Sequence, residues 1–257
     1  MRRASTPQSA RRERVLDAAP SRTILFALSP RTVIAKASER GWSTRQSLRV
    51  ARAVAGLPQE PAHTPELVVS FLDPADFPAL PCALPDARDR NKLGLVALER
   101  TRAEGAGELV VAHHEGEIAA IHFIHTAAHW ERLERVAPRL YEPLQEDEAL
   151  TEGVFVFPDF RGRGIAPQML RASSSELGRR GFRRCLAVID LGNAPSLRAF
   201  STAGYDAEPI MRVDAYRLGR RTSRFVAAGA DALRRYDDAV GRREAPAGPR
   251  PASRAIS

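Results

Sequence analysis

The most informative stretch of this sequence is Gly153-Val154-Phe155-Val156-Phe157-Pro158-Asp159-Phe160-Arg161-Gly162-Arg163-Gly164-Ile165-Ala166. It predicts an apolar strand that ends at a proline, a short loop containing glycine, and a helix. The first N–H groups of a helix have no partner within it, and the helix dipole adds positive potential, so this loop is suited to a diphosphate. Gly162 and Gly164 would let a ligand approach the backbone closely. The stretch fits neither the Walker motif, which needs Gly-Lys-Ser/Thr, nor GxGxxG.

A second stretch follows, Asp190-Leu191-Gly192-Asn193-Ala194-Pro195-Ser196-Leu197-Arg198-Ala199-Phe200-Ser201-Thr202-Ala203-Gly204-Tyr205. It predicts a strand end, an asparagine, a helix and a glycine–aromatic pair. The two stretches together resemble the GNAT superfamily of acyl-CoA-dependent N-acyltransferases. The segment from Arg161 to Ala166 matches the superfamily's Arg/Gln-x-x-Gly-x-Gly/Ala signature, and the second stretch matches its second motif. The similarity extends from about Glu66 to Leu218.

The resemblance implies where coenzyme A would bind. The strand that ends at Phe157 would separate from its neighbour, and its backbone would pair with the pantetheine arm at Phe155, Val156 and Phe157. The pyrophosphate would be held by the N–H groups of Arg161, Gly162, Arg163, Gly164, Ile165 and Ala166. Asn193 and Ser196 would face the far side of the cofactor. A backbone N–H near Phe155 or Val156 would stabilise the oxyanion that forms when an amine attacks the thioester.

An ammonium group must lose a proton before its nitrogen attacks, either to a carboxylate or through water. The interval from Glu142 to Glu152 holds five acidic residues and no basic one. GNAT enzymes often place a catalytic glutamate at the start of this strand, so the resemblance makes Glu152 the first candidate base and Glu148 the second. The alternative is that these acids form a solvated loop that only raises the local concentration of cations.

One position departs from the family pattern. Many GNAT enzymes carry a tyrosine four residues before the glycine of the second motif, where it donates a proton to the leaving thiolate. The residue here is Phe200. Protonation by water, or departure as the free thiolate, therefore becomes the expected route.

The fold class predicted is α/β, of the α+β GNAT type, with a mixed, mostly antiparallel sheet that splays at its fourth strand and is flanked by helices. The expected strands are 67–72, 108–113, 118–126, 153–157, 185–191 and 210–218. The expected helices are 88–102, 164–180 and 195–203, with a further one opening at Asp73 and another around Trp130 to Tyr141.

The charge of the chain is uneven and suggests three parts. Residues 1–56 hold 12 basic and 3 acidic side chains, residues 57–211 hold 16 and 23, and residues 212–257 hold 11 and 5. We expect a basic N-terminal extension (1–62), a GNAT-like acetyltransferase domain (63–219) and a basic, largely disordered C-terminal tail (220–257) with at most one short helix.

Within the extension, residues 44–57 have the periodicity of a basic amphipathic helix, with Arg45, Arg49 and Arg52 on one face. Such a helix either packs on its own domain or makes a weak contact with a membrane surface. No nucleic acid partner is expected, because the helix has few aromatics and no named motif matches. Apolar runs are too short to cross a bilayer, and the N-terminus does not resemble a signal peptide.

Cysteines and histidines give no sign of a metal. Cys82 and Cys185 lie far apart, so neither a disulfide framework nor a CxxC site is expected, and a reducing, cytoplasmic location follows. Five histidines cluster between His113 and His129. On a strand, His122 and His125 point to opposite faces, and no familiar ligand spacing is complete. We expect them on the surface or beside the substrate, and no metal site.

The sequence thus predicts an N-acetyltransferase that uses acetyl-CoA and acts on a primary amine of a small molecule, by direct attack in a ternary complex. The insert Ala127 to Leu150 falls where GNAT proteins build the acceptor pocket. Its acidity favours a cationic acceptor, such as an amino sugar or a glycan precursor. The rival is a non-catalytic GNAT-fold module that binds acyl-CoA without turnover, suggested by Phe200. The acceptor, the acyl chain length and the oligomeric state stay open.

Overall fold

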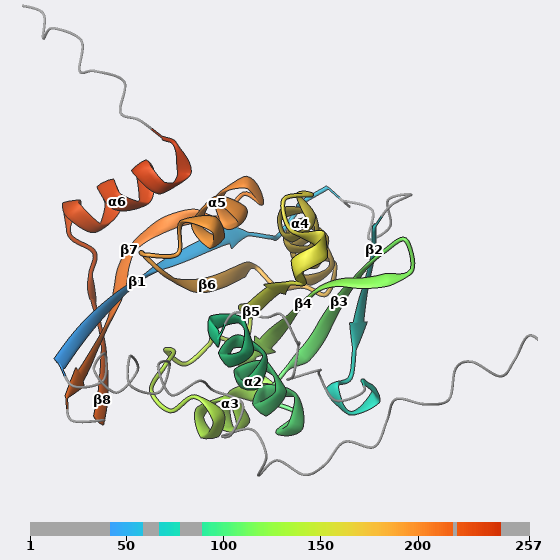
Figure 1. The fold of residues 1–257 in the computed structure, drawn as a ribbon, viewed down its shortest axis with the longest axis horizontal. Helices are drawn as coiled ribbons and strands as arrows, with labels where there is room; N and C mark the ends of the chain where they lie inside the picture. The colour runs from blue at the N-terminus through green and yellow to red at the C-terminus, as the bar shows by residue number, and fades with distance from the viewer. Residues whose placement is uncertain (1–41, 59–66, 78–88, 218–219, 243–257) are drawn as a thin grey trace, which may run out of the picture.

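A computed structural model describes residues 42–58, 67–77, 89–217 and 220–242. These residues form one eight-stranded sheet in the order β2-β3-β4-β5-β6-β1-β7-β8 (Figure 1). Its strands are β1 Trp42–Ala53, β2 Leu67–Leu72, β3 Glu108–His114, β4 Glu117–Thr126, β5 Glu148–Val156, β6 Arg184–Asp190, β7 Asp206–Arg217 and β8 Arg220–Ala227. Each pair of neighbours is antiparallel except β5 and β6, which run parallel. The predicted fold class is confirmed.

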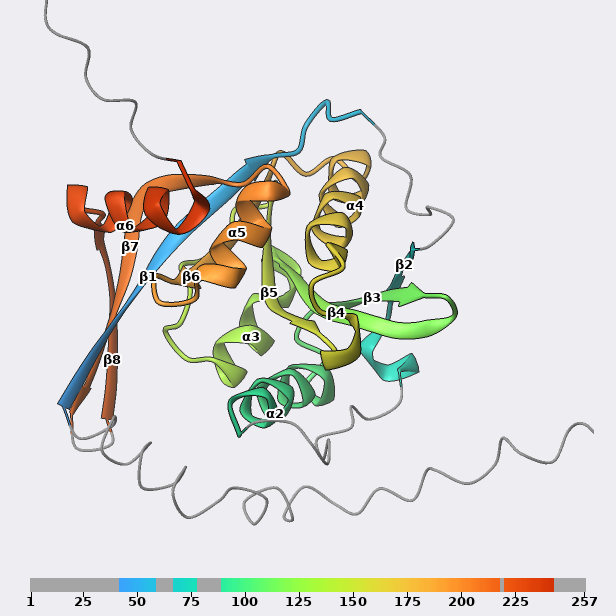
Figure 2. The ribbon, with the colours of Figure 1, turned by 45° about the horizontal axis from the view of Figure 1, so that its top comes forward.

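Helices cover both faces of this sheet (Figure 2). One face carries α4 Ile165–Arg179, α5 Ala194–Thr202 and α6 Ala230–Val240, and the other carries α2 Asp89–Ala103 and α3 Trp130–Val136. Met169 and Leu170 of α4 are fully buried in the larger core, while Leu95 and Leu98 of α2 join Phe123 in a smaller core on the opposite face. A two-faced sheet requires near-continuous apolar strands, and Ala119 to Ile124 of β4 provide one.

The centre of the sheet opens at β5. Parallel pairing with β6 covers only three residues, Glu148 to Leu150, and then stops. On its other edge β5 pairs with β4, but Phe123 is opposite Glu152 while Ile121 is opposite Phe155. The two residues of β5 that lie between Glu152 and Phe155 form a β-bulge, and one of them, Gly153, has a φ of 68°. The expected splay is therefore present.

The segment expected to be an amphipathic helix is instead β1, a strand between β6 and β7. The basic and apolar residues of 44–57 fit both helical and strand spacing, and burial against two neighbouring strands decides between them. A strand places Arg49 and Arg52 on opposite faces. Leu48 and Val50 are fully buried. Because the segment is a strand, the membrane contact that was inferred from a basic helix has no support. The predicted N-terminal extension (1–62) is also wrong from Trp42 onward, since β1 belongs to the sheet.

The C-terminal part also differs from prediction as far as Arg242. Instead of a disordered tail, β8 pairs along β7, and α6 packs on the sheet through Ala232 and Tyr236. The Tyr236 hydroxyl donates a hydrogen bond to the carbonyl of Tyr205 at 3.2 Å. Residues 1–41 and 243–257, which complete the two basic parts, lie outside the described residues.

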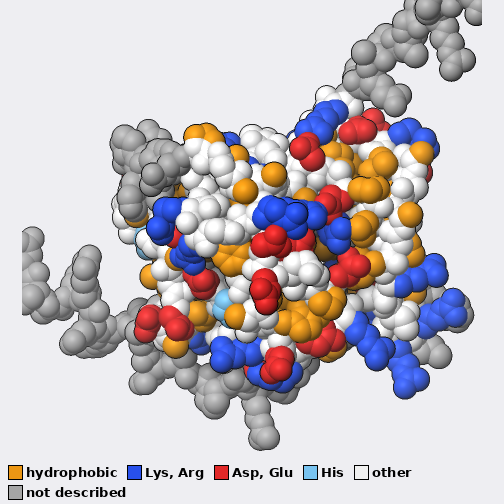
Figure 3. All heavy atoms as spheres, turned by 180° about the vertical axis from the view of Figure 1, so that it is seen from behind, with side chains coloured by type: hydrophobic (Ala, Val, Ile, Leu, Met, Phe, Trp, Pro, Cys, Tyr) orange, Lys and Arg blue, Asp and Glu red, His pale blue; other side chains and the backbone are white. Residues whose placement is uncertain are grey.

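Strand β8 forms an edge of the sheet and is rich in arginine. Arg220, Arg221 and Arg224 are exposed on it, and basic side chains gather at this end of the molecule in the view from behind (Figure 3). Charged residues on an edge strand disfavour unwanted pairing with another chain.

Two smaller differences have local causes. The helix expected at Asp73 is a single 3-10 turn, η2 Pro74–Asp76, capped by the Asp73 carboxylate, which accepts from the N–H of Ala75 at 2.8 Å. The helix α3, entered through the 3-10 turn η3 Ala127–His129, ends at Val136, two residues before Pro138, and does not reach Tyr141. A residue that precedes proline disfavours the helical conformation.

Candidate active site

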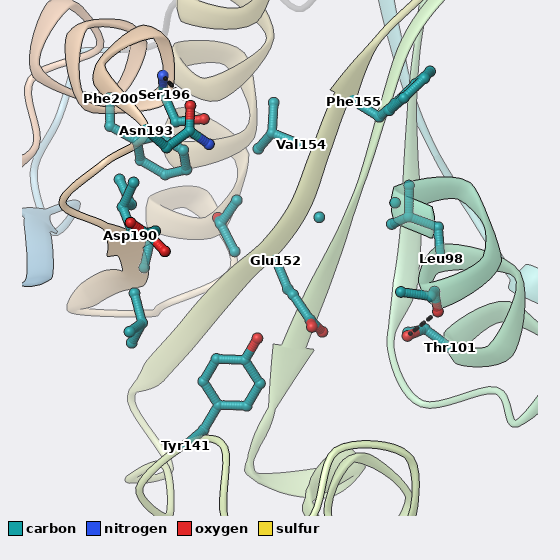
Figure 4. Close-up of a pocket in the computed structure, with 17 residues that line it drawn as sticks. Leu98, Thr101, Tyr141, Glu152, Val154, Phe155, Asp190, Asn193, Ser196 and Phe200 are labelled. Carbon is teal, nitrogen blue, oxygen red and sulfur yellow. Dashed lines mark hydrogen bonds between the residues drawn. The ribbon is translucent and has the colours of Figure 1, made fainter. Parts of the chain in front are cut away.

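A pocket of about 310 Å³ lies where β5 and β6 separate (Figure 4). Strand β5 contributes Thr151 to Phe155, and β6 contributes Ala187 to Asp190. The remaining walls come from α2, α5 and the loop after α3, through Gly94, Ala97, Leu98, Thr101, Asn193, Ser196, Phe200 and Tyr141. The pocket therefore lies beside the bulge and continues toward the start of α5.

The loop after β5 provides a cradle for an anion. It contains the 3-10 turn η4 Pro158–Phe160, and both Gly162 and Gly164 have positive φ, of 79° and 71°. Among the described residues, no backbone hydrogen bond uses the N–H groups of Gly162, Arg163 or Gly164. Ile165 and Ala166 are the first residues of α4, so their N–H groups also lack partners within the helix. A Cβ on Gly162 would meet nothing within 4 Å, so the cradle is open. Five of the six predicted residues, Gly162 to Ala166, thus have N–H groups that fit a diphosphate. The sixth, Arg161, does not, because its N–H donates to the carbonyl of Pro158 at 3.2 Å.

The backbone of β5 fits the predicted pantetheine contact only in part. The carbonyl of Val156 faces away from β4 and accepts a hydrogen bond from Arg161 Nε at 3.0 Å. In contrast, the Phe157 N–H donates to the carbonyl of Ala119 and the Phe157 carbonyl accepts from the N–H of Phe160, both at 3.0 Å. Phe155 is opposite Ile121 in the ladder with β4. Of the three residues predicted to pair with the pantetheine arm, Val156 thus has the backbone best placed toward the opening. Phe157 cannot pair in this way, because its N–H and its carbonyl are already hydrogen-bonded.

Helix α5 begins at the far side of the pocket. Asn193 caps the helix, because its side-chain oxygen accepts from the N–H of Ser196 at 3.3 Å. Phe200 also lines the pocket, packed edge-on against Tyr205 with ring centroids 5.0 Å apart. The structure thus places Asn193 and Ser196 with Phe200, the position where many relatives carry a tyrosine, on one wall.

Glu152 points into the pocket, toward the hydroxyl of Tyr141 (Figure 4). Its side chain is 23% exposed, and its Oε2 lies 2.9 Å from Nε2 of His125. Burial by itself would raise the pKa of Glu152, but hydrogen bonds from His125 and Tyr141 and the positive charges of His125 and Arg212 outweigh it and lower the pKa. Glu152 is therefore a carboxylate at neutral pH, held in one orientation.

Glu148, the second candidate base, does not line the pocket. It begins β5, is 8% exposed, and pairs with Arg184 at 3.4 Å. Four residues along a strand separate it from Glu152 by roughly 13 Å. Two other acids of the predicted interval are also used elsewhere, since Glu142 pairs with Arg49 at 2.7 Å and Asp147 with Arg183 at 2.7 Å.

Tyr141 is a site residue that sequence reasoning missed. Burial, followed by the charge of Glu152, raises its pKa well above the ordinary value, so its hydroxyl stays protonated and can donate to the carboxylate. Its loop is held from the distant strands β7 and β8: Arg212 donates to the carbonyl of Leu140 at 2.8 Å, and Arg221 donates to that of Pro138 at 2.8 Å. The acidity of the insert was a signal that this loop matters, but nothing in the sequence indicated which residue reaches the pocket.

The histidines were expected on the surface or beside the substrate, but His122 and His125 of β4 are both fully buried, and of these two only His125 lies beside the candidate site. They do lie on opposite faces: His122 contacts Ser173 of α4 at 2.9 Å, while His125 contacts Glu152. Within the described ranges, no three His, Cys, Asp or Glu side chains lie together as metal ligands would. Among the same residues, no helix is both long and apolar enough to span a membrane.

Comparison with known proteins identifies a family for this chain. The model of the acetyltransferase (GNAT) family matches residues 72–205, which is more than half of the chain. A comparison with curated proteins gives no significant match. Among solved structures, the chain is similar to an acetyltransferase of the GNAT family from Novosphingobium aromaticivorans, with 17% identity over 73% of this chain and 66% of that chain and a TM-score of 0.39. It is also similar to a GCN5-related N-acetyltransferase from Sphaerobacter thermophilus, with 16% identity over 74% and 57% and a TM-score of 0.41.

The chain belongs to the GNAT acetyltransferase family. The matched region includes β5, the loop after it and α4. The chain spans less than two thirds of the length of the first solved structures that it matches.

Proposed function

We propose that this protein transfers the acetyl group of acetyl-CoA to the primary amine of a small molecule, by direct attack in a ternary complex. The observation that carries the proposal is that one strand, β5, connects the two parts the reaction needs. Its C-terminal end leads into the anion cradle, and its bulge presents Glu152 to the pocket. A thioester bound along the opening would place its carbonyl beside the bulge.

In this proposal, acetyl-CoA provides an activated acyl group, and the chain's own residues bind and orient it. The N–H groups from Gly162 to Ala166 hold the diphosphate. Asn193 and Ser196 line the opposite wall. Glu152 takes up the proton of the acceptor's ammonium group, directly or through a water molecule. Because Phe200 has no hydroxyl, the sulfur departs as thiolate or is protonated by water.

The charge of the pocket supports a cationic acceptor. Glu152 and Asp190 both line it, and a carboxylate pair attracts an ammonium group. The wall from α2 is formed by Gly94, Ala97, Leu98 and Thr101. The hydroxyl of Thr101 already donates a hydrogen bond to the carbonyl of Ala97 at 3.2 Å. This wall favours an acceptor with one apolar side. An amino sugar or glycan precursor, with the apolar face of its ring on α2, is the acceptor that we propose.

A second candidate function is binding of acyl-CoA without turnover. The observation in its favour is Phe200, which leaves the pocket without the phenol that many relatives use. Loss of this donor need not stop the reaction, because a thiol of pKa about 8.5 is already a tolerable leaving group at neutral pH. We therefore rank the enzyme above the binding module.

Two measurements test the proposal. Thiol release from acetyl-CoA is followed with a panel of amino sugars, alkylamines and amino acids, and we expect turnover with at least one amine. Calorimetry with acetyl-CoA is then repeated on Gly164→Glu, in which an acidic side chain would enter the cradle. Binding should weaken by at least about 100-fold, since like charges repel and the N–H groups are blocked.

The matched control is Gly181→Glu. Gly181 lies just beyond the other end of α4, also has positive φ, of 92°, and has open space around it. Both variants therefore place a side chain at a positive φ and add the same charge. Equal acetyl-CoA affinity in the two variants would show that the cradle is not the binding site. Tight binding with no turnover of any amine would favour the binding module.

A further inference from the structure

His125 is a buried side chain that the proposed reaction has not yet used. Its exposed fraction is 0%, and it lies on β4 beside the bulge. One ring nitrogen, Nδ1, contacts the carbonyl oxygen of Ala106, and the other, Nε2, lies 2.9 Å from Oε2 of Glu152. Both nitrogens of the imidazole therefore face oxygen atoms.

These contacts determine where protons can lie. The Ala106 carbonyl can only accept, so Nδ1 always carries hydrogen. A carboxylate can also only accept, so a hydrogen bond between Nε2 and Oε2 requires one proton between them. His125 and Glu152 thus form a dyad that holds one shared proton in its loaded state. In its unloaded state, the lone pair of Nε2 faces the carboxylate.

The ring is fixed in this position by its neighbours. It stacks on Phe123 with centroids 6.3 Å apart and planes at 17°, and a Cβ added to Gly107 would lie only 2.7 Å from Nδ1. The titratable and charged groups that interact with the dyad from the packed elements are Tyr141, Arg212 and His129 on its own side and, across the sheet, His122. Burial, and then the charge of His125, lowers the pKa of His122 to about 3, so His122 stays neutral and does not compete for the proton.

We propose that His125 is the positioning residue of Glu152 and the place where the proton from the acceptor amine comes to rest. The inference rests on the acetyl transfer proposed above. A lone carboxylate is a weak base at neutral pH, whereas imidazole is the side chain whose ordinary titration range lies nearest to it. In the dyad, the proton that Glu152 receives passes on to the imidazole, so Glu152 stays a carboxylate, and Glu152 is the member of the pair that lines the pocket.

Protons and electrons balance in this step. In the unloaded dyad, an N–H bond of the acceptor's ammonium group breaks, its electron pair stays on nitrogen, and the proton passes to Glu152. The same or an equivalent proton then bonds to Nε2 of His125, which leaves an imidazolium beside a carboxylate. The freed nitrogen pair is the nucleophile. The loaded dyad returns its proton to solvent after the product leaves.

The kinetic test compares His125→Gln with the wild type across pH 5–10, with one accepted amine. Glutamine keeps a donor toward Glu152 but cannot take a proton. We expect kcat/KM to fall by about tenfold or more, and the acid limb of its pH profile to move to lower pH by at least about one unit, because only the carboxylate then titrates. A role in structure alone would lower the rate equally at every pH. The control variant His122→Gln, at an equally buried histidine of the same strand, should not shift the acid limb of the pH profile.

A second readout needs no activity. In protein labelled with ¹⁵N-histidine, the ring nitrogens of His125 should show Nδ1 protonated at every pH and Nε2 gaining and losing a proton as the dyad loads. Replacement Glu152→Gln should lower the pH at which this occurs, since the carboxylate no longer stabilises the imidazolium. An Nε2 signal that does not respond to Glu152→Gln would overturn the dyad. If this response is present but no amine is acetylated, the proposed function fails and the dyad stands.

Discussion

His122 and His125 are three residues apart on β4 and have opposite electrical surroundings. Ser173 donates its hydroxyl hydrogen to the carbonyl of Met169 at 2.8 Å, so it must accept from Nε2–H of His122. Among the described residues, Nδ1 of His122 has no hydrogen-bond partner. A second proton there would be a buried charge without a partner, and this explains why burial lowers the pKa of His122 to about 3.

This environment predicts how stability depends on pH. The folded pKa of about 3 lies below the ordinary 6.5, so the unfolded chain binds more protons between these values. The contribution of His122 is fully present above pH 6.5 and is lost as the pH falls toward 3, by about 2 kcal/mol at pH 5. Urea unfolding at pH 7.5 and 5.0 measures it. In His122→Gln, the difference between the two pH values should be smaller by that amount, and an unchanged difference would contradict the assignment.

Helix α4 lies close to the end of β1, and a glycine makes this approach possible. A Cβ added to Gly178 would lie 2.2 Å from the carbonyl oxygen of Val54, which is backbone and cannot turn aside. The neighbouring N–H of Val54 donates to the carbonyl of Arg183 at 2.9 Å, so this end of β1 is fixed from two directions. The helix that opens the anion cradle is thus docked against the strand that sequence analysis assigned to an extension.

The same substitution should therefore have opposite effects in two helices. Gly178→Ala should destabilise the fold by about 1 to 3 kcal/mol, because backbone must move to admit the methyl group. Gly94→Ala in α2 places its methyl 3.9 Å from Phe155, an ordinary contact, and should be neutral or stabilise by up to about 1 kcal/mol through helix propensity. Thermal unfolding of both variants tests this, and a loss of equal size in the two would contradict the close contact at Val54.

At the scale of the whole molecule, the ends of the described chain support the centre of the site. Strand β1 lies in the sheet between the part that contains β5 and the outer strands β7 and β8, and it connects the two. From this outer part, Arg49 pairs with Glu142, and Arg212 and Arg221 bind carbonyls of the loop that carries Tyr141. Buried Arg212 is itself held by Asp214 at 3.0 Å and by Ser47 at 3.3 Å. The wall of the pocket that carries Tyr141 thus depends on strands far from it in sequence.

Loosening this support should affect the acceptor and not coenzyme A. Arg221→Ala removes one hydrogen bond from the exposed outer strand to Pro138 and should raise the KM for the amine by roughly fivefold, the effect of about 1 kcal/mol. The affinity for acetyl-CoA should stay unchanged, because the cradle is at the other end of β5. Arg224→Ala, another exposed arginine of β8, is the control and should alter neither constant. An equal change in both variants would indicate general charge loss instead.

The sequence by itself determined the cradle and the class of fold, because both depend on local chemistry. A strand, a glycine loop and the free N–H groups of a helix start are adjacent in the chain, so Gly162 and Gly164 could be assigned from residue order alone, while Asn193 came from the resemblance to the family. Only the tertiary structure decided the rest. The segment that became β1 carries a pattern that fits two periods, and its pairing with β6 and β7 selected the strand. The dyad joins His125 of β4 to Glu152 of β5, two residues that are 27 apart in the sequence. Such a contact exists only once the register of the two strands and the bulge have set which side chains face each other.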